Sequence, residues 1–226
     1  MKSSHSQSPF NARSIATWAL LAALTPTLAG CFGAAVVGVG AGALMVADRR
    51  PAETQLTDQG IEMRAANRIS EKLADRAHVN VTSYNRSVLL TGEVSDEAAK
   101  AETEKLVSGV PNVKAISNEL QVAGNTSLGA RSNDTFITSK VKGRFIDANK
   151  FPVNQVKVVT EAGVVYLLGL VTKQEADAAV DIARTTGGVV KVVRVLEIVS
   201  EEQARQMDNQ PATATANAPA TNAPRK

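Results

Sequence analysis

The stretch SVLLTGEVSDEAAKAETEKLVSGVPNVKAISNELQV, from Ser87 to Val122, is echoed by VVYLLGLVTKQEADAAVDIARTTGGVVKVVRVLEIV, from Val164 to Val199. Apolar residues alternate in each copy up to a glycine, Gly92 or Gly169, and a valine follows two residues later. Alternation with a period of two is the pattern of a β-strand. Because the whole pattern recurs in the same order, the sequence predicts two copies of one structural unit.

A helix and a further strand follow the glycine in each copy. The helix is predicted to begin at a capping residue, Ser95 in the first copy and Thr172 in the second. Thr172 and Glu175 have the Thr-x-x-Glu spacing of a capping box. The β-branched stretches that come next, Val113 to Val122 and Val189 to Val199, predict strands.

Three more elements are expected before the glycine of each copy: a helix, a short strand and a tight turn. Their ranges are Ile61 to Leu73, Val79 to Thr82 and Tyr84 to Arg86 in the first copy, and Thr135 to Ile146, Val156 to Thr160 and Glu161 to Gly163 in the second. The order α-β-β-α-β thus occurs twice. A hairpin followed by a right-handed crossover gives a three-stranded mixed sheet with two helices on one face, so the predicted fold class is α+β.

This pattern resembles the BON domain, a small module of bacterial envelope proteins. The most recognisable residues are Val88 to Val94 and Val164 to Val171. The resemblance implies two tandem BON domains, at residues 57–122 and 133–200, with a linker at 123–132. The chain after residue 200 ends in a low-complexity, proline-rich stretch, so residues 201–226 are predicted to form a disordered tail.

The first thirty residues have the order of an export signal. Lys2 and Arg13 precede the apolar run Ile15 to Leu24, which is too short to span a bilayer core of ~30 Å. The run ends in Leu28-Ala29-Gly30-Cys31, and Cys31 is the single cysteine of the chain. This tetrapeptide resembles the lipobox of bacterial lipoproteins. The resemblance implies cleavage of the signal at residues 1–30, acylation of Cys31 with fatty acids, and an acylated tether at 31–56.

Two other interpretations of this segment stay open. One is an ordinary cleaved signal followed by a chance cysteine, and the other is an uncleaved membrane span from Leu28 to Ala47, which its Gly and Ala residues make weakly apolar. Several acyl chains, by contrast, anchor a protein stably. The residue after Cys31 is Phe32 rather than an Asp retention signal, which by the same resemblance implies the periplasmic face of the outer membrane.

Charge and composition exclude several classes of function. The chain has 25 basic and 22 acidic residues, and removal of the signal takes away two bases and no acid, which leaves a net charge of +1. The sequence therefore predicts no nucleic-acid partner. Gly38, Gly40 and Gly42 lack the strand and the spacing of a nucleotide-binding loop. No nucleophile with a base, paired metal ligands or catalytic motif occurs, so we expect no enzyme, no catalytic residue, no metal and no cofactor.

The first helix of the second copy has two apolar sides. Ile137, Val141, Phe145 and Ala148 share one side of a helical wheel and are expected to face the sheet. The opposite side carries apolar and small residues, and Lys140 and Lys142 flank it on either side. The candidate phospholipid-binding residues are Phe136, Ser139, Lys140, Lys142, Gly143, Arg144 and Ile146. Alternatively, Phe136 packs under the linker or against the first domain, and the lysines belong to a solvated helix face.

The corresponding helix of the first copy is expected to be polar on its outward side. Aligning Val141 with Ile69 places Arg64, Asn67, Glu71 and Ala74 there. Residues 131–157 hold six bases and two acids, whereas residues 58–76 hold four of each. Basic residues contribute ~1 kcal/mol each near an anionic membrane surface, and apolar residues add burial. Only the second domain is therefore predicted to attract anions.

The whole chain resembles dual-BON outer-membrane lipoproteins. This resemblance implies binding of anionic phospholipids, such as phosphatidylglycerol and cardiolipin, by the second domain, together with support of outer-membrane integrity and localisation to division sites. The alternative function is a periplasmic adaptor for envelope assembly, division or cell-wall proteins, because exposed apolar groups also mark protein partner sites.

The lipobox generates a direct prediction. Cys31→Ala should block acylation and normal processing, because the thiol is the acceptor of the lipid, and should leave precursor or mislocalised protein. Membrane fractionation combined with labelled fatty acid measures this. A variant that still reaches the outer membrane at mature size and carries label would contradict the lipobox interpretation.

Overall fold

The computed structural model describes residues 48–124 and 126–209 of the 226-residue chain. The predicted signal at 1–30, Cys31, most of the tether at 31–56 and the end of the tail lie outside these residues. Within the described ranges, no helix has both the length and the apolar character needed to cross a membrane.

Two α/β units follow each other along the chain, as the repeat predicts. The elements of the first are α2 (Ala52–Leu73), the 3-10 turn η2 (Ala74–Arg76), β1 (Ala77–Tyr84), β2 (Ser87–Val94), α3 (Glu97–Ser108), β3 (Ala115–Asn118) and β4 (Gln121–Val122). Those of the second are α4 (Leu128–Ala148), η3 (Val153–Gln155), β5 (Lys157–Glu161), β6 (Val164–Val171), α5 (Lys173–Arg184) and β7 (Lys191–Ile198), and α6 (Glu201–Asp208) comes last.

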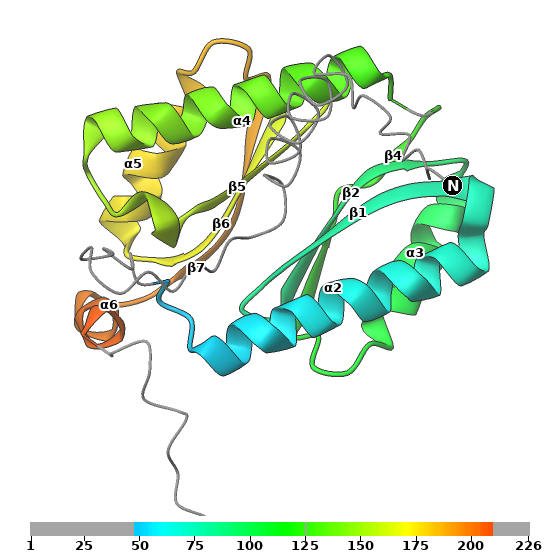
Figure 1. Ribbon diagram of the computed structural model, residues 1–226, viewed down its shortest axis with the longest axis horizontal. Coiled ribbons are helices and arrows are strands. Elements are labelled where there is room, and N and C mark those ends of the chain that lie inside the picture. The colour runs from blue at the N-terminus through cyan, green and yellow to red at the C-terminus, as the bar shows by residue number, and fades with distance from the viewer. Residues whose placement is uncertain (1–47, 125, 210–226) are drawn as a thin grey trace, which may run out of the picture. The chain divides into compact units, whose positions relative to one another are not determined.

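Each unit has the predicted α+β topology, with two helices on one face of a mixed sheet (Figure 1). The hairpin strands pair antiparallel, and the strand after the crossover helix pairs parallel with the central strand. The predicted strand Val113 to Val122 is interrupted, because the side chain of Asn118 accepts the Leu120 N–H that would otherwise belong to a strand. β3 and β4 therefore lie beside β2 as two pieces in one register.

A buried aspartate in the second turn of the first helix holds the hairpin turn of each unit. Asp58 accepts hydrogen bonds from the amides of residues 85 and 86 at 2.8 and 2.7 Å, and Asp134 accepts them from those of residues 162 and 163 at 2.9 and 2.8 Å. All four turn residues have positive φ, as a two-residue type I′ turn requires. These bonds fix both the turn and the rotation of each helix about its axis.

The glycine of each central strand is required by a close backbone approach. A Cβ atom on Gly92 would lie 2.1 Å from the carbonyl oxygen of His78, and one on Gly169 would lie 2.3 Å from that of Gln155. Since backbone atoms cannot move aside as a side chain can, no other residue fits at either position.

Two predicted helix starts have different outcomes. Thr172 caps α5 in a complete capping box with Glu175, as predicted. The prediction of Ser95 is wrong by one residue: Asp96 caps α3, and its carboxylate accepts the Ala99 N–H at 2.7 Å. An Asp carboxylate caps a helix as well as a Ser hydroxyl does. The Ser95 hydroxyl donates to the Asp96 carboxylate and does not cap the helix itself.

The predicted segments outside the repeats are shorter than expected. α4 begins at Leu128, inside the predicted linker 123–132, because Ser127 caps it. α2 begins at Ala52, inside the predicted tether 31–56. The prediction of disorder is wrong for residues 201–208, which form α6 with a capping box between Ser200 and Gln203.

Both faces of each central strand are buried. β2 and β6 each contain seven consecutive buried residues. Val88 and Leu90 pack with α2 and α3, and Val165 and Leu167 pack with α4 and α5. The alternate residues contribute to a third apolar cluster, which joins the two units through Tyr84, Leu89, Tyr166, Leu168 and Leu170.

The two arginines that precede α2 are held by different units. Arg49 is 5% exposed, and its guanidinium donates to the Leu170 carbonyl, to both carboxylate oxygens of Glu175 and to both of Asp208, at 2.7 to 3.0 Å. Arg50 pairs with Asp58 at 2.7 Å and lies 3.8 Å from the ring centroid of Tyr84. The segment Asp48 to Pro51 is therefore part of the folded structure and connects α2, the second unit and α6.

Arg49→Ala should destabilise the fold by about 3 kcal/mol, because it leaves the largely buried Glu175 carboxylate without its partner. Urea denaturation measures the change. Arg184→Ala is the matched control. Arg184 and Asp181 form an ion pair exposed to solvent, so this substitution should change stability by less than ~1 kcal/mol. Equal effects of the two substitutions would contradict a structural role for Arg49.

The same pair predicts a dependence on pH. Burial opposes the ionisation of Glu175, but hydrogen bonds from Arg49 and from the Thr172 N–H outweigh that cost and hold the pKa of Glu175 below its usual value. Such a group adds stability above its unfolded pKa, ~4.3 for Glu, and the gain disappears as the pH falls through the lower folded pKa. The difference in unfolding free energy between the native chain and Arg49→Ala should therefore shrink below about pH 4.3. A difference that stays constant down to acidic pH would mean that Arg49 acts through packing alone.

Candidate functional site

Helix α4 buries the side that the sequence analysis assigned to the sheet. Ile137, Val141 and Phe145 are fully buried, and the ring of Phe145 meets that of Phe151 edge-on at 5.0 Å. Ala148 is exposed, which contradicts its predicted place on this side. It is the last residue of the helix, and Asn149 ends the helix there in the left-handed conformation.

The outward side of α4 exposes large apolar side chains. Phe136 is 61% exposed and Ile146 is 62% exposed, as expected for candidate contact residues. Ser139 and Lys142 are also exposed, and a Cβ atom on the half-buried Gly143 would meet only open space. The alternative in which Phe136 packs under the linker or against the first domain is therefore wrong.

Leu128 adds to this side and was missed by the sequence analysis. It is 80% exposed and lies in the first turn of α4, in a stretch that was predicted to be linker. Leu128 and Ile146 are 18 residues apart, which is five full turns at 3.6 residues per turn, so they point in the same direction. The signal that could have identified it is Ser127, a capping residue directly before the helix. Phe136 lies about 80° around the helix from Leu128 and Ile146, so the three side chains mark a broad exposed apolar side along nearly the whole helix.

Two of the three candidate bases on α4 point toward the end of α5. Lys140 donates to the Gly187 carbonyl and lies 4.8 Å from the ring centroid of Phe136. Arg144 donates to the Ile182 carbonyl at 2.9 Å and to the hydroxyls of residues 185 and 186 at 3.0 Å. Their side chains therefore attach α4 to the following loop, whereas Lys142 is exposed on the opposite flank of the helix, where it lines a pocket with Ser139 and Glu161.

The arginine contact with the second helix occurs in both units. Arg68 donates to the Leu106 carbonyl at 3.4 Å in the last turn of α3, as Arg144 does to Ile182 in α5. Cations are favoured near the last carbonyls of a helix. Arg68 and Arg144 are thus equivalent, and so are Asp58 and Asp134.

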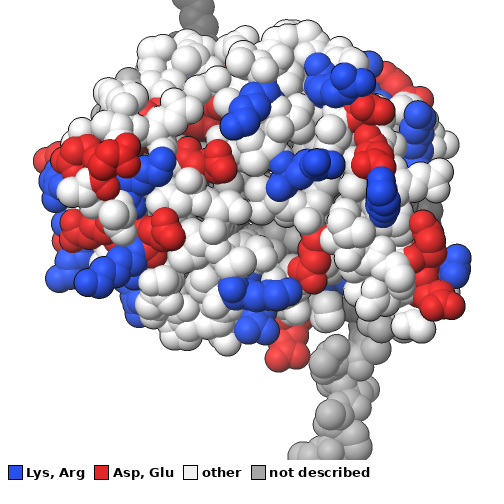
Figure 2. Space-filling view, turned by 180° about the vertical axis from the view of Figure 1, so that it is seen from behind, with Lys and Arg blue, Asp and Glu red and all other residues white. Residues whose placement is uncertain are grey.

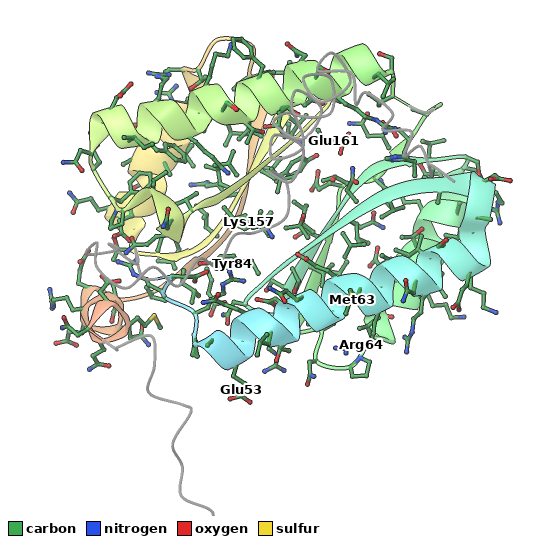
Figure 3. The ribbon with its side chains drawn as sticks, viewed as in Figure 1. Glu53, Met63, Arg64, Tyr84, Lys157 and Glu161 are labelled. Atoms are coloured by element: carbon green, nitrogen blue, oxygen red, sulfur yellow. The ribbon has the colours of Figure 1, made fainter. Side chains whose placement is uncertain are left out.

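This equivalence corrects the alignment of the two helices. Val141 corresponds to Ala65, one helical turn before the predicted Ile69. The outward positions of α2 that match those of α4 are therefore not Arg64, Asn67, Glu71 and Ala74 but Gly60, Met63, Asn67 and Ser70. Met63 is 67% exposed, so the outward side of α2 is not purely polar (Figure 3).

The charge around α4 is more balanced than the count along the sequence suggests. Lys157 and Glu161 lie at the two ends of β5 (Figure 3). Lys157 pairs with Glu62 at 3.4 Å, and Glu161 accepts a hydrogen bond from Asn80 at 2.9 Å. Figure 2 shows Lys and Arg interspersed with Asp and Glu on the face it draws, without a large area of one sign. Because Lys157 is paired, attraction of α4 to an anionic surface depends on the bases beside its exposed apolar residues.

The described residues contain no cluster of three or more His, Cys, Asp or Glu side chains placed to hold a metal ion. The site is thus an exposed helix side of apolar and small residues with bases beside it.

Comparison with known proteins identifies the family. The model of the BON domain matches residues 57–124 and 133–200. The outer membrane lipoprotein DolP of Haemophilus influenzae is 38% identical over 182 residues, which cover 79% of this chain and 94% of that protein. A 21 kDa hemolysin of Actinobacillus pleuropneumoniae is 35% identical over 154 residues, covering 67% of this chain and 79% of that protein.

Among solved structures, CdsD, a structural protein of the type III secretion system of Chlamydia trachomatis, matches with a TM-score of 0.27 and 13% identity over 65% of this chain and 98% of that one. That likeness is too low to carry an argument. The family model and the two relatives, in contrast, cover both repeated units and most of the sequence. The chain belongs to the BON-domain family, as a protein with two tandem BON domains that is similar to the lipoprotein DolP.

Proposed function

We propose that this protein is a lipoprotein of the outer membrane, anchored through acylated Cys31 after removal of residues 1–30, that faces the periplasm and binds anionic phospholipid through α4. Its two BON domains act without catalysis. Binding of phosphatidylglycerol or cardiolipin by the second domain supports the integrity of the outer membrane and concentrates the protein at division sites.

The observation that carries this proposal is the exposed apolar side of α4, made by Leu128, Phe136 and Ile146. Three large apolar side chains on one helix cost free energy in water and gain it in a membrane interface. Lys142 on one flank of these residues and Lys140 beside Phe136 on the other supply positive charge for lipid phosphates. The name of the H. influenzae relative, an outer membrane lipoprotein, supports the location.

A second candidate function is a periplasmic adaptor that binds envelope assembly or cell-wall proteins. The observation that favours it lies in the first domain, where α2 exposes Leu56 and Met63 at 68% and 67%. A groove runs between α2 and α3 on the same domain and is lined by charged and apolar side chains: Arg68, Glu71, Lys72, Ala101, Glu102, Lys105 and Leu106. An adaptor would bind its partner through these exposed residues of α2 and the groove beside them, whereas a lipid-binding protein would bind the membrane through α4.

Phe136→Glu should weaken binding to anionic vesicles by ~1.5 to 3 kcal/mol, or roughly ten- to hundredfold in Kd, because it removes an exposed ring and adds a negative charge. Sedimentation with vesicles of phosphatidylglycerol and phosphatidylethanolamine measures this, using the chain from residue 31 with Cys31→Ser so that no acyl chain contributes. Binding should also fall as salt shortens the Debye length from ~10 Å at 0.1 M to ~3 Å at 1 M.

Two variants control for folding and for general hydrophobicity. Met63→Glu changes an equally exposed residue of the first domain and should leave vesicle binding unchanged. Val141→Glu places a charge in the core and should unfold the second domain, whereas Phe136→Glu should change stability by only ~0.5 kcal/mol. The proposal fails if Phe136→Glu leaves vesicle binding unchanged, or if vesicles of phosphatidylcholine alone bind the chain equally well.

A further inference from the structure

The loop between α5 and β7, residues 185–190, is fixed to the flank of α4. Arg144 donates to the hydroxyls of Thr185 and Thr186, and Lys140 donates to the carbonyl of Gly187. These two bases share one flank of the helix. Their contacts place the loop beside Phe136, because the Lys140 ammonium also lies 4.8 Å from the centroid of the Phe136 ring.

Gly188 allows the loop to approach the helix this closely. Its φ is +100°, and a Cβ atom there would lie 3.1 Å from the side chain of Ile137 and 3.5 Å from the Lys140 nitrogen. The end of the loop is held as well, since the Val190 N–H donates to the Gly163 carbonyl in the hairpin turn at 2.9 Å. The loop is thus attached to α4 at its middle and to the hairpin at its end.

This fixed loop presents an apolar side chain to solvent. Val190 is 80% exposed, as much as Leu128, and the next residue, Lys191, is exposed too. The equivalent residue of the first domain is Lys114, whose N–H makes the same bond to the hairpin turn, at 2.8 Å to the Arg86 carbonyl. Lys114 is paired with Glu197 at 3.4 Å. Only the second domain therefore exposes an apolar residue at this place.

We propose that Val190 and Lys191 form a second contact with an anionic phospholipid bilayer, beside the outward side of α4. The inference rests on the proposed lipid binding by α4 and extends it to a second element. Charge complementarity favours a bilayer as the occupant, because Lys191 follows Val190 just as Lys140 accompanies Phe136, and each pair offers an apolar group with a cation for the lipid phosphate. Two contacts from different elements also fix the rotation of the domain on the membrane, which one helix alone would leave free.

The single cysteine of the chain makes the test direct. The chain from residue 31 with Cys31→Ser has no thiol, so one new cysteine at a time can carry an environment-sensitive fluorophore. Val190→Cys, Phe136→Cys and Ile198→Cys place it in the loop, on α4 and at a control position. Ile198 is an apolar residue of the same domain, 55% exposed, at the opposite end of β7, ~26 Å along the strand from Val190.

With vesicles of phosphatidylglycerol and phosphatidylethanolamine, the probes at 136 and 190 should shift to shorter wavelength and the probe at 198 should not. Val190→Asp should weaken vesicle binding about tenfold, whereas Ile198→Asp should leave it unchanged, with melting curves to verify that both remain folded. A response at 136 without one at 190 overturns this inference and leaves the function of α4 intact. If neither of these two probes shifts, both the proposed function and this inference are overturned. An equal shift at 198 overturns the inference that the loop makes a specific contact with the bilayer.

Discussion

The burial of each central strand on both faces is the constraint on which this structure depends. Helices cover one face of β2 and β6, but Leu89, Tyr166 and Leu168 point to the other face and are as fully buried. A single BON unit with this sequence would expose those side chains to water. They are covered because they join one cluster to which both units contribute, together with Met207 of α6. The tandem arrangement is therefore a requirement for stability, and the two domains share a core besides their own.

The sequence was sufficient to predict the repeat, the order of the elements and the buried side of α4, because these follow from local periodicity. The alignment of the two first helices could not be obtained in this way. A slip of four residues keeps almost the same side of a helix buried, so periodicity does not distinguish Ala65 from Ile69 as the partner of Val141. The aspartates could have decided it, since Asp58 and Asp134 each stand three residues before a buried isoleucine.

Other features depend on partners that are remote in the sequence. Arg49 looks like a solvated residue two positions before a proline, and its carboxylate partners are 126 and 159 residues away. Lys140 was expected to flank the outward side and Arg144 to contact lipid, but the end of α5 and the loop after it offer both of them carbonyl acceptors. A helical wheel gives the direction of a Cα–Cβ bond, whereas the terminal group of a long side chain goes where hydrogen-bond acceptors are available.

Because Arg49 is held by the second domain, the affinity that α4 needs for a membrane depends on the length of chain between Arg49 and Cys31. If Cys31 is embedded in a bilayer, Asp48 lies at most ~60 Å from it, because a fully extended chain of this length reaches no further. Arg49, the residue after Asp48, is attached to the second domain. The distance from α4 to the lipid would then be limited to this length plus the size of one domain. Tethering over such a distance corresponds to an effective concentration of about millimolar. A Kd near ~1 mM for lipid would then keep α4 bound to the membrane for much of the time. A few exposed side chains are then enough, and the local lipid composition can decide whether the domain lies on the membrane or stands away from it.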